Sequence, residues 1–140
     1  MKQAKINFEG KIITLRIIVP MNEAGAREVS KMYYKEADGV IFLYDIQKKN
    51  SFTQLKISIR KVMNDYPSKP RILIGNTNDD FPNIIITSEE GKKLADEFIM
   101  PFFETSTKTK QNINEAFNFL LHEIQKKAKE EEKPKACTCF

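Results

Sequence analysis

The 140-residue sequence has only two cysteines, Cys137 and Cys139, and both lie in its last four residues. By themselves they can build neither a disulfide framework nor a metal site. No apolar run approaches the ~20 residues that span a bilayer. The segment from Met1 to Phe8 is charged and alternating, unlike a signal peptide. These absences predict a chain that is made and kept on the cytosolic side.

A large excess of charge of one sign is also absent. The sequence has 23 Lys and Arg against 19 Asp and Glu, and its net charge is +4. Nucleic-acid-binding proteins usually concentrate positive charge on one face, whereas most lysines here are spread along the chain. We therefore predict no nucleic-acid partner. The only histidine, His122, falls on an expected helix and is interpreted as a surface residue, not a catalyst.

Five apolar runs are typical of β-strands. They lie at 5–8, 11–19, 39–44 and 71–74, and a last one begins at 101. Glu9 and Gly10 separate the first two runs, which is a turn signal typical of a hairpin. The runs at 39–44 and 71–74 are almost wholly apolar, as in parallel strands that are buried on both faces.

Three segments have the helical period of about 3.6 residues. One opens with Thr87-Ser88-Glu89-Glu90, a capping box, and Asn112 is expected to cap the last helix. The expected core positions of the three helices are Phe52, Leu55, Ile59, Val62 and Met63; Leu94, Ala95 and Phe98; and Ile113, Ala116, Phe117, Leu120, Leu121 and Ile124. With one more helix after the second strand, the order of elements predicts a single α/β domain with a mainly parallel sheet.

Ligands of such sheets bind in the loops beyond the carboxyl ends of the strands. Gly75-Asn76-Thr77-Asn78-Asp79 follows one strand, and Glu104-Thr105-Ser106-Thr107-Lys108-Thr109 follows the next. Together they resemble the two guanine-recognition motifs of the Ras superfamily, Asn-Lys-x-Asp and Ser-Ala-Lys. A carboxylate at Asp79 could accept bonds from both the ring N–H and the amino group of guanine.

The resemblance implies roles for the other motif residues. Asn76 would hold the base edge and brace the neighbouring loop, and Lys108 would lie along the base. Backbone N–H groups near Ser106 and Thr107 would face the guanine carbonyl oxygen. Thr77 stands where the family has lysine.

Other segments resemble Rab proteins in particular. They are Met32-Tyr33-Tyr34-Lys35-Glu36-Ala37-Asp38-Gly39, Tyr44-Asp45 with Asn50-Ser51-Phe52, Ser88-Glu89-Glu90-Gly91 and Pro101-Phe102-Phe103-Glu104-Thr105-Ser106. The motifs occur in the family's order and cover nearly the whole chain. The resemblance implies an incomplete Ras-like GTPase fold, with an N-terminal hairpin and without the family's first strand, phosphate-binding loop (P-loop) and first helix.

The departures from the family concern the phosphates and catalysis. The five glycines include no pair with the spacing of Gly-x-x-x-x-Gly-Lys-Ser/Thr, the loop that wraps phosphates. The switch-II-like segment is Asn22-Glu23-Ala24-Gly25-Ala26, or begins three residues earlier, at Val19. On either count it has no magnesium-shell Asp and no water-positioning Gln. We therefore expect no catalytic residue, no bound magnesium and weak or no binding of GTP or GDP.

The family's first strand lies centrally in its sheet, so its absence leaves two strand edges facing each other. We predict that Ile12–Val19 pairs directly with Gly39–Tyr44, or that two copies associate edge to edge.

A Lys- and Glu-rich tail is expected at 126–140, after a domain at 1–125. It ends in Cys137-Thr138-Cys139-Phe140, which fits a prenylation box with Cys137 as acceptor and a last residue that favours geranylgeranyl. It also resembles the Cys-x-Cys end of many Rab proteins, where both thiols carry lipid. A peripheral position on the cytosolic face of a membrane follows from this interpretation.

Three functions stay open at this point. The chain is a Rab-like pseudo-GTPase of vesicle traffic that contacts effectors or escort proteins, or a GTP-hydrolysing Rab whose missing segment comes from elsewhere. The third is a purely structural role in a larger assembly.

Overall fold

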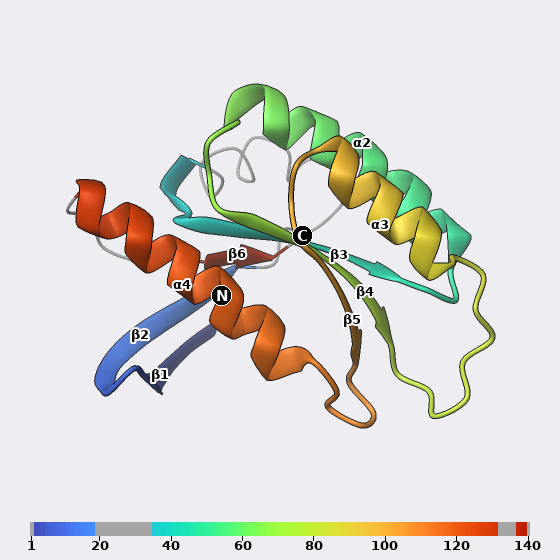
Figure 1. Ribbon diagram of the computed structural model, residues 1–140, viewed down its shortest axis with the longest axis horizontal. Coiled ribbons are helices and arrows are strands. Elements are labelled where there is room, and N and C mark those ends of the chain that lie inside the picture. Colours follow the sequence, from blue (N-terminus) through green and yellow to red (C-terminus); the bar gives the residue numbers. More distant parts are fainter. Residues whose placement is uncertain (1, 19–34, 132–136, 140) are drawn as a thin grey trace.

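The computed structural model describes residues 2–18, 35–131 and 137–139 (Figure 1). Within these residues, one six-stranded sheet has the order β1-β2-β6-β3-β4-β5. Helices α2 and α3 cover one face of this sheet and α4 covers the other (Figure 1). The switch-II-like residues 22–26 and most of the helix expected after the second strand lie outside the described residues.

The first two strands form the predicted hairpin. β1 (Lys2–Phe8) pairs antiparallel with β2 (Lys11–Ile18), and Phe8 lies opposite Lys11. The two turn residues, Glu9 and Gly10, have φ of 52° and 79°. Positive φ at both central residues is the backbone of a type I′ turn, whose twist matches that of the flanking strands.

The rest of the described fold is the predicted alternation of parallel strands and helices, so the α/β fold class is confirmed. The strands β3, β4 and β5 pair in parallel, in that order. The bounds are Gly39–Asp45 for β3, Lys49–Asp65 for α2, Arg71–Thr77 for β4, Ser88–Glu97 for α3, Phe102–Ser106 for β5 and Ile113–Glu131 for α4.

The helix starts differ in how they are capped. The Thr87 hydroxyl accepts from the Glu90 backbone N–H at 3.2 Å, as predicted for the start of α3. Asn112 precedes α4, but its side-chain amide donates to the Glu104 carbonyl at 2.9 Å and so ties the helix to β5. At its other end, α4 continues to Glu131.

Two apolar cores lie on opposite faces of the same strands. Val40, Phe42 and Tyr44 of β3 pack with α2 and α3. Ile41 of β3 packs with α4 on the other face, together with Ile72 and Ile74 of β4. The pleat of a strand sends successive side chains to opposite faces, so the continuous apolar runs of the sequence are strands covered on both sides.

Direct pairing of the second and third strands was expected and is wrong. Residues Cys137–Cys139 form β6, which lies between β2 and β3 and runs parallel to both. The end of the chain thus provides backbone partners to two strands that would otherwise face each other unpaired. This contact between the chain's last residues and its centre has no sequence signal, because three residues carry no readable period.

Candidate functional site

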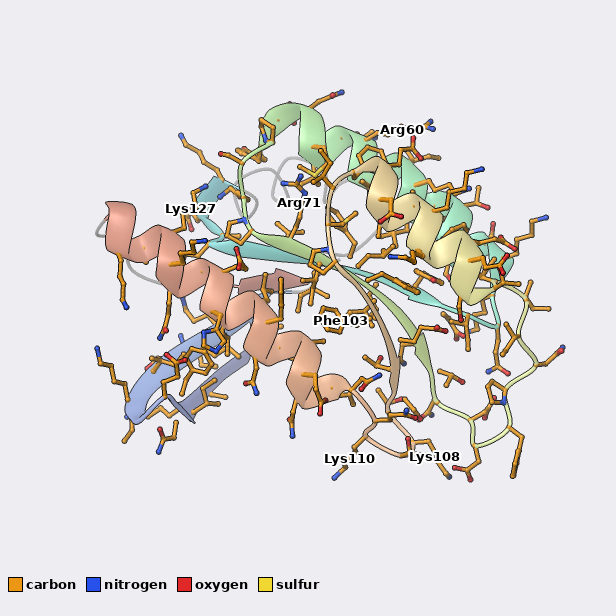
Figure 2. All side chains as sticks on the ribbon, viewed as in Figure 1. Arg60, Arg71, Phe103, Lys108, Lys110 and Lys127 are labelled. Atoms are coloured by element: carbon orange, nitrogen blue, oxygen red, sulfur yellow. The ribbon has the colours of Figure 1, made fainter. Side chains whose placement is uncertain are left out.

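The two motif segments lie side by side because their strands are neighbours. In the β4–β5 ladder, Asn76 pairs with Thr105 and Thr77 pairs with Ser106. Parallel neighbours end at the same edge of a sheet, so the loops that follow the two strands leave the sheet together. Figure 2 shows Lys108 in the second of these loops, at the tip of the molecule below the sheet.

Hydrogen bonds join the two loops. The Thr105 hydroxyl donates to Asn76 Oδ1 at 2.6 Å, and the Thr107 hydroxyl donates to Asn78 Oδ1 at 2.9 Å. The Thr107 backbone N–H donates to the Thr77 carbonyl at 3.0 Å. Asn76 therefore braces the neighbouring loop, in the way that the motif implies for its side chain.

Thr77 has a structural part in this site. It is buried, and its hydroxyl accepts from the Asp79 backbone N–H at 3.2 Å. This bond closes a tight turn after β4 and sets the direction in which the Asp79 side chain leaves the backbone. A threonine can make this bond and a lysine cannot, so the departure from the Asn-Lys-x-Asp pattern has a local physical role.

The Asp79 carboxylate already has a partner. Gln47 Nε2 donates to Asp79 Oδ2 at 2.6 Å. Gln47 is itself held at both ends: its backbone N–H donates to Asp45 Oδ1 at 2.9 Å, and its Oε1 accepts from the Asn83 backbone N–H at 2.9 Å. Sequence reasoning missed Gln47, because a contact across 32 residues leaves no local pattern.

The backbone N–H groups of the second loop are also used internally. Ser106 donates to the Gln111 carbonyl at 3.2 Å, and Thr107 donates to Thr77 as described. The Ser106 hydroxyl accepts from the Thr109 backbone N–H at 3.1 Å. The two N–H groups that were expected to face a guanine carbonyl oxygen thus point to protein acceptors in this structure.

Comparison with known proteins places the chain in a family. A model of the Ras family matches residues 1–126. The chain belongs to the Ras family.

Its relatives include Rab proteins. Ras-related protein RABD1 of Arabidopsis thaliana is 35% identical over 124 residues, which make up 87% of this chain and 60% of the relative. Ras-related protein Rab-8B of Dictyostelium discoideum is 35% identical over 123 residues, which make up 87% of this chain and 61% of the relative. GTP-binding protein ypt2 of Schizosaccharomyces pombe is 35% identical over 122 residues, which make up 86% of this chain and 61% of the relative. This Ras-family chain is Rab-like, and it spans about 60% of the length of these relatives.

A guanine base fits the residue types of the site but not their present hydrogen bonds. The acidic side chain, the bracing Asn76 and the loop with Lys108 are all at one edge of the sheet. A guanine bound at Asp79 would compete with Gln47 for Oδ2, and the second loop would have to release one of its N–H groups. Each such exchange costs part of the free energy that binding provides.

Tyr44 lies beneath the site, and its hydroxyl leaves no room for a side chain at two glycines of the segments that resemble the family. A Cβ at Gly75 would come within 2.7 Å of the Tyr44 hydroxyl, and one at Gly91 within 2.3 Å. Among the described residues, the buried Tyr44 hydroxyl has no hydrogen-bond partner. Burial, and then the negative charges of Glu104 and Glu90, raise the pKa of Tyr44.

The described residues contain no group of three or more His, Cys, Asp or Glu that could hold a metal ion. No helix in the described parts of the chain is long and apolar enough to cross a membrane. His122 is exposed on α4, where its Nε2 lies 3.1 Å from Glu9 Oε1 and its ring packs edge-on against Phe8. It therefore ties the hairpin turn to α4.

A second group of basic residues lies at the opposite edge of the sheet, around the start of β4. Figure 2 shows Arg71 and Lys127 there. The Arg71 guanidinium donates to the carbonyls of Pro67, Lys69 and Phe98, and Lys127 Nζ donates to the Ser68 carbonyl at 2.7 Å. These cations hold loops together, and burial lowers the pKa of Arg71.

Proposed function

We propose that this Rab-like chain is an interaction module of membrane traffic that binds guanine nucleotides weakly or not at all. One observation carries the proposal. Of the groups that would recognise guanine, Oδ2 of the exposed Asp79 carboxylate already accepts from Gln47, and the Thr107 backbone N–H already donates to Thr77. In addition, residues 1–140 contain no Gly-x-x-x-x-Gly-Lys-Ser/Thr loop.

Magnitudes favour weak binding by these residues. Hydrogen bonds to charged groups contribute roughly 1.5–3 kcal/mol each, and a base held by three or four of them must offset an association cost of roughly 4–15 kcal/mol. Without phosphate contacts, the result is an affinity of about 1 mM or weaker. Hydrolysis would further need a phosphate cradle, a metal and an oriented water, for which the printed sequence offers no residues in the family's pattern.

Isothermal titration of the purified chain with GDP and GTP, each with and without magnesium, tests this function. We expect dissociation constants of about 1 mM or weaker for both nucleotides, and no effect of magnesium. Sub-micromolar binding would contradict the proposal.

A substitution at Gln47 tests whether a base-binding site is present but occupied by Gln47, or absent. Gln47→Ala frees the Asp79 carboxylate, so we expect guanosine affinity to rise by about 3- to 10-fold, which corresponds to one hydrogen bond. Adenosine, which presents no matching pair of donors, should not gain. Gln54→Ala, on an exposed position of α2, is the matched control. An equal gain for both nucleosides would show that the freed carboxylate is not what recognises the base.

The second candidate is a GTP-binding and GTP-hydrolysing Rab in which a segment outside residues 1–140 supplies the phosphate contacts. One observation favours it: the Thr105 hydroxyl donates to Asn76 Oδ1, so the two motif loops are held together. The ypt2 relative of Schizosaccharomyces pombe is also named a GTP-binding protein. Under this alternative, nucleotide binding appears when the complementary segment is added, and Asp79→Ala abolishes it.

For the C-terminus we propose geranylgeranylation at Cys137, with Cys139 as a second acceptor, and attachment to the cytosolic face of a membrane. Two lipid chains, or one chain and a basic tail, are needed for stable attachment. Rab-type effectors or escort proteins would then contact the switch-II-like residues 22–26. Mass spectrometry of the chain made in a eukaryotic host tests the lipid, and an unmodified terminal peptide would refute it.

A further inference from the structure

A cleft of about 540 Å³ lies at the end of the sheet where β4 and β5 begin. It is lined by residues 68–71 at the start of β4, by Ile99 and Pro101 between α3 and β5, and by residues of α4 between Phe119 and Lys127. Figure 2 shows Lys127 at this end of the molecule, opposite the motif loops. The volume lies within the range of roughly 300–1,000 Å³ that is typical of binding pockets.

The lining of the cleft is mainly basic. Lys69, Arg71, Lys126 and Lys127 contribute four cations, against the carboxylate of Glu123. The Arg71 guanidinium donates to neutral backbone carbonyls, which fix its position but do not cancel its charge. Its Nε atom is buried and has no hydrogen-bond partner among the described residues. Lys126 is exposed at the cleft, so an acidic ligand would meet complementary charge there.

The segment after α3 holds an apolar side chain in solvent in an unfavourable backbone conformation. Phe98 is the C-cap of α3. The Ile99 N–H donates to the Asp96 carbonyl at 3.2 Å, and the Met100 N–H donates to the Ala95 carbonyl at 3.0 Å. These two bonds form a Schellman motif, in which the residue after the cap is left-handed and usually glycine. Ile99 has φ of 53°, which is strained for a β-branched residue, and it is 85% exposed.

Further apolar residues line the same cleft. Phe119 of α4 is 39% exposed, and its ring packs against that of Phe103, with centroids 5.8 Å apart. Pro70 and Pro101 also contribute, and proline offers contact area without a loss of side-chain entropy on binding. The cleft therefore combines positive charge with apolar surface, and the strained Ile99 adds to that surface.

We propose that this cleft is a docking site for an acidic peptide segment of a partner protein. The fitting segment carries a bulky apolar side chain with aspartate or glutamate on both sides of it. The apolar side chain contacts Ile99 and Phe119. A flanking carboxylate pairs with the exposed Lys126, and Arg71 adds positive charge from its fixed position.

Such a peptide fits the cleft better than a phosphate group or a membrane surface. Glu123 would repel the concentrated charge of a phosphate group, whereas single carboxylates along a peptide can stay away from it. A lipid bilayer presents a broad surface, and a cleft instead accepts individual side chains. The inference does not depend on nucleotide binding, because the cleft and the guanine motifs lie at opposite edges of the sheet.

The test uses the full chain and a fluorescent peptide of about ten residues in which aspartates flank a central leucine–phenylalanine pair. We expect saturable binding by fluorescence polarisation and an affinity that falls several-fold as the salt concentration rises. The same peptide with lysines in place of the aspartates should not bind. In nitrogen–proton correlation spectra, the amides of Ile99 and Lys126 should shift as the acidic peptide is added, and that of Lys108 should not.

Reversal of one charge tests the basic lining. Lys126→Glu should weaken peptide binding by about 10-fold. Lys110→Glu makes the same change of charge at the other end of the molecule, where Figure 2 shows Lys110, and should leave the affinity unchanged.

Substitution of Ile99 separates a binding role from a structural one. Ile99→Gly removes the side chain and suits the left-handed conformation, so the thermal midpoint should rise by a few degrees. The acidic peptide should nevertheless bind about 5- to 10-fold more weakly, because it loses an apolar contact. Ile99→Asn, which also tolerates this conformation, should weaken binding in the same way.

Several results would overturn the proposal. They are an absence of saturable binding of the acidic peptide, binding that Lys126→Glu leaves unchanged, and an Ile99→Gly chain that is less stable but binds normally. Vesicles of phosphatidylserine and phosphatidylcholine provide the last comparison. If Lys126→Glu weakened sedimentation with these vesicles while the peptide failed to bind, the cleft would face a membrane and not a peptide.

Discussion

At the end of β3, Tyr44 holds a buried hydroxyl for which the described residues offer no hydrogen-bond partner. An unsatisfied buried hydroxyl lowers stability by about 1–3 kcal/mol. We therefore expect Tyr44→Phe to leave the free energy of unfolding at pH 7 unchanged or to raise it by about 1 kcal/mol. Urea unfolding followed by circular dichroism measures this.

The same substitution should change the alkaline limit of stability. Burial raises the folded-state pKa of Tyr44 above the unfolded value of about 10. The folded state then binds more protons than the unfolded state above pH ~10, so stability falls as pH rises beyond that value. Tyr44→Phe should make this fall shallower. Equal alkaline slopes for the Tyr44 variant and the unsubstituted chain would contradict the assignment.

At the scale of elements, α3 approaches the sheet more closely than a side chain would allow. A Cβ at Gly91 would lie 2.3 Å from the Tyr44 hydroxyl and 2.5 Å from Phe102 Cζ. In an exposed helix, Gly→Ala stabilises by about 1 kcal/mol. Here we expect the opposite sign, a loss of roughly 1–3 kcal/mol. Lys93→Ala, at an exposed position of the same helix, should change stability little.

A double-mutant cycle measures how much of this loss of stability comes from the contact with Tyr44. Tyr44→Phe removes the nearest atom, so it should recover part of the cost of Gly91→Ala, and the contact with Phe102 should keep the rest. Strictly additive unfolding free energies for the two substitutions would show that Tyr44 does not set the approach of α3.

The helices and parallel strands could be predicted from the sequence because their signals are local. Thr87 accepts from Glu90 as the capping box implies, and the apolar stripe of α2 is buried at Phe52, Leu55 and Ile59. The strand β6 and the bond between Gln47 and Asp79 could not. Both depend on segments distant in the chain that meet only after the sheet has formed, so residue type and spacing carry no sign of them.

The same limit applies to the candidate site. The motif residues Asn76, Asp79 and Lys108 could be found because their order along the chain is that of a known family. Whether their polar groups are available depends on neighbours that the motifs do not include. The Thr107 backbone N–H is an example, because only the paired strands show that it donates to Thr77.

At the scale of the whole molecule, the two apolar cores share the strands β3 and β4. Tyr44 belongs to the core beneath α2 and α3, and Leu120 of α4 belongs to the other. Both faces of β3 and β4 carry apolar side chains, so the loss of either cover would expose apolar surface of the shared strands, and the two cores should unfold together. The chain should therefore behave as a two-state domain, as most domains under 150 residues do.

Leu120→Ala tests this coupling. Leu120 is 1% exposed, and truncation of a buried leucine costs about 2–5 kcal/mol. We expect the thermal midpoint to fall by the same amount in two signals, the near-ultraviolet signal of the tyrosines and helical circular dichroism. The first signal reports on the far face of the sheet, because Tyr44 is buried there. Asn118→Ala, an exposed neighbour on α4, should shift neither. If the near-ultraviolet signal kept its original midpoint while the helical signal fell, each face of the sheet would be folding independently. The shared strands would then not couple the two cores.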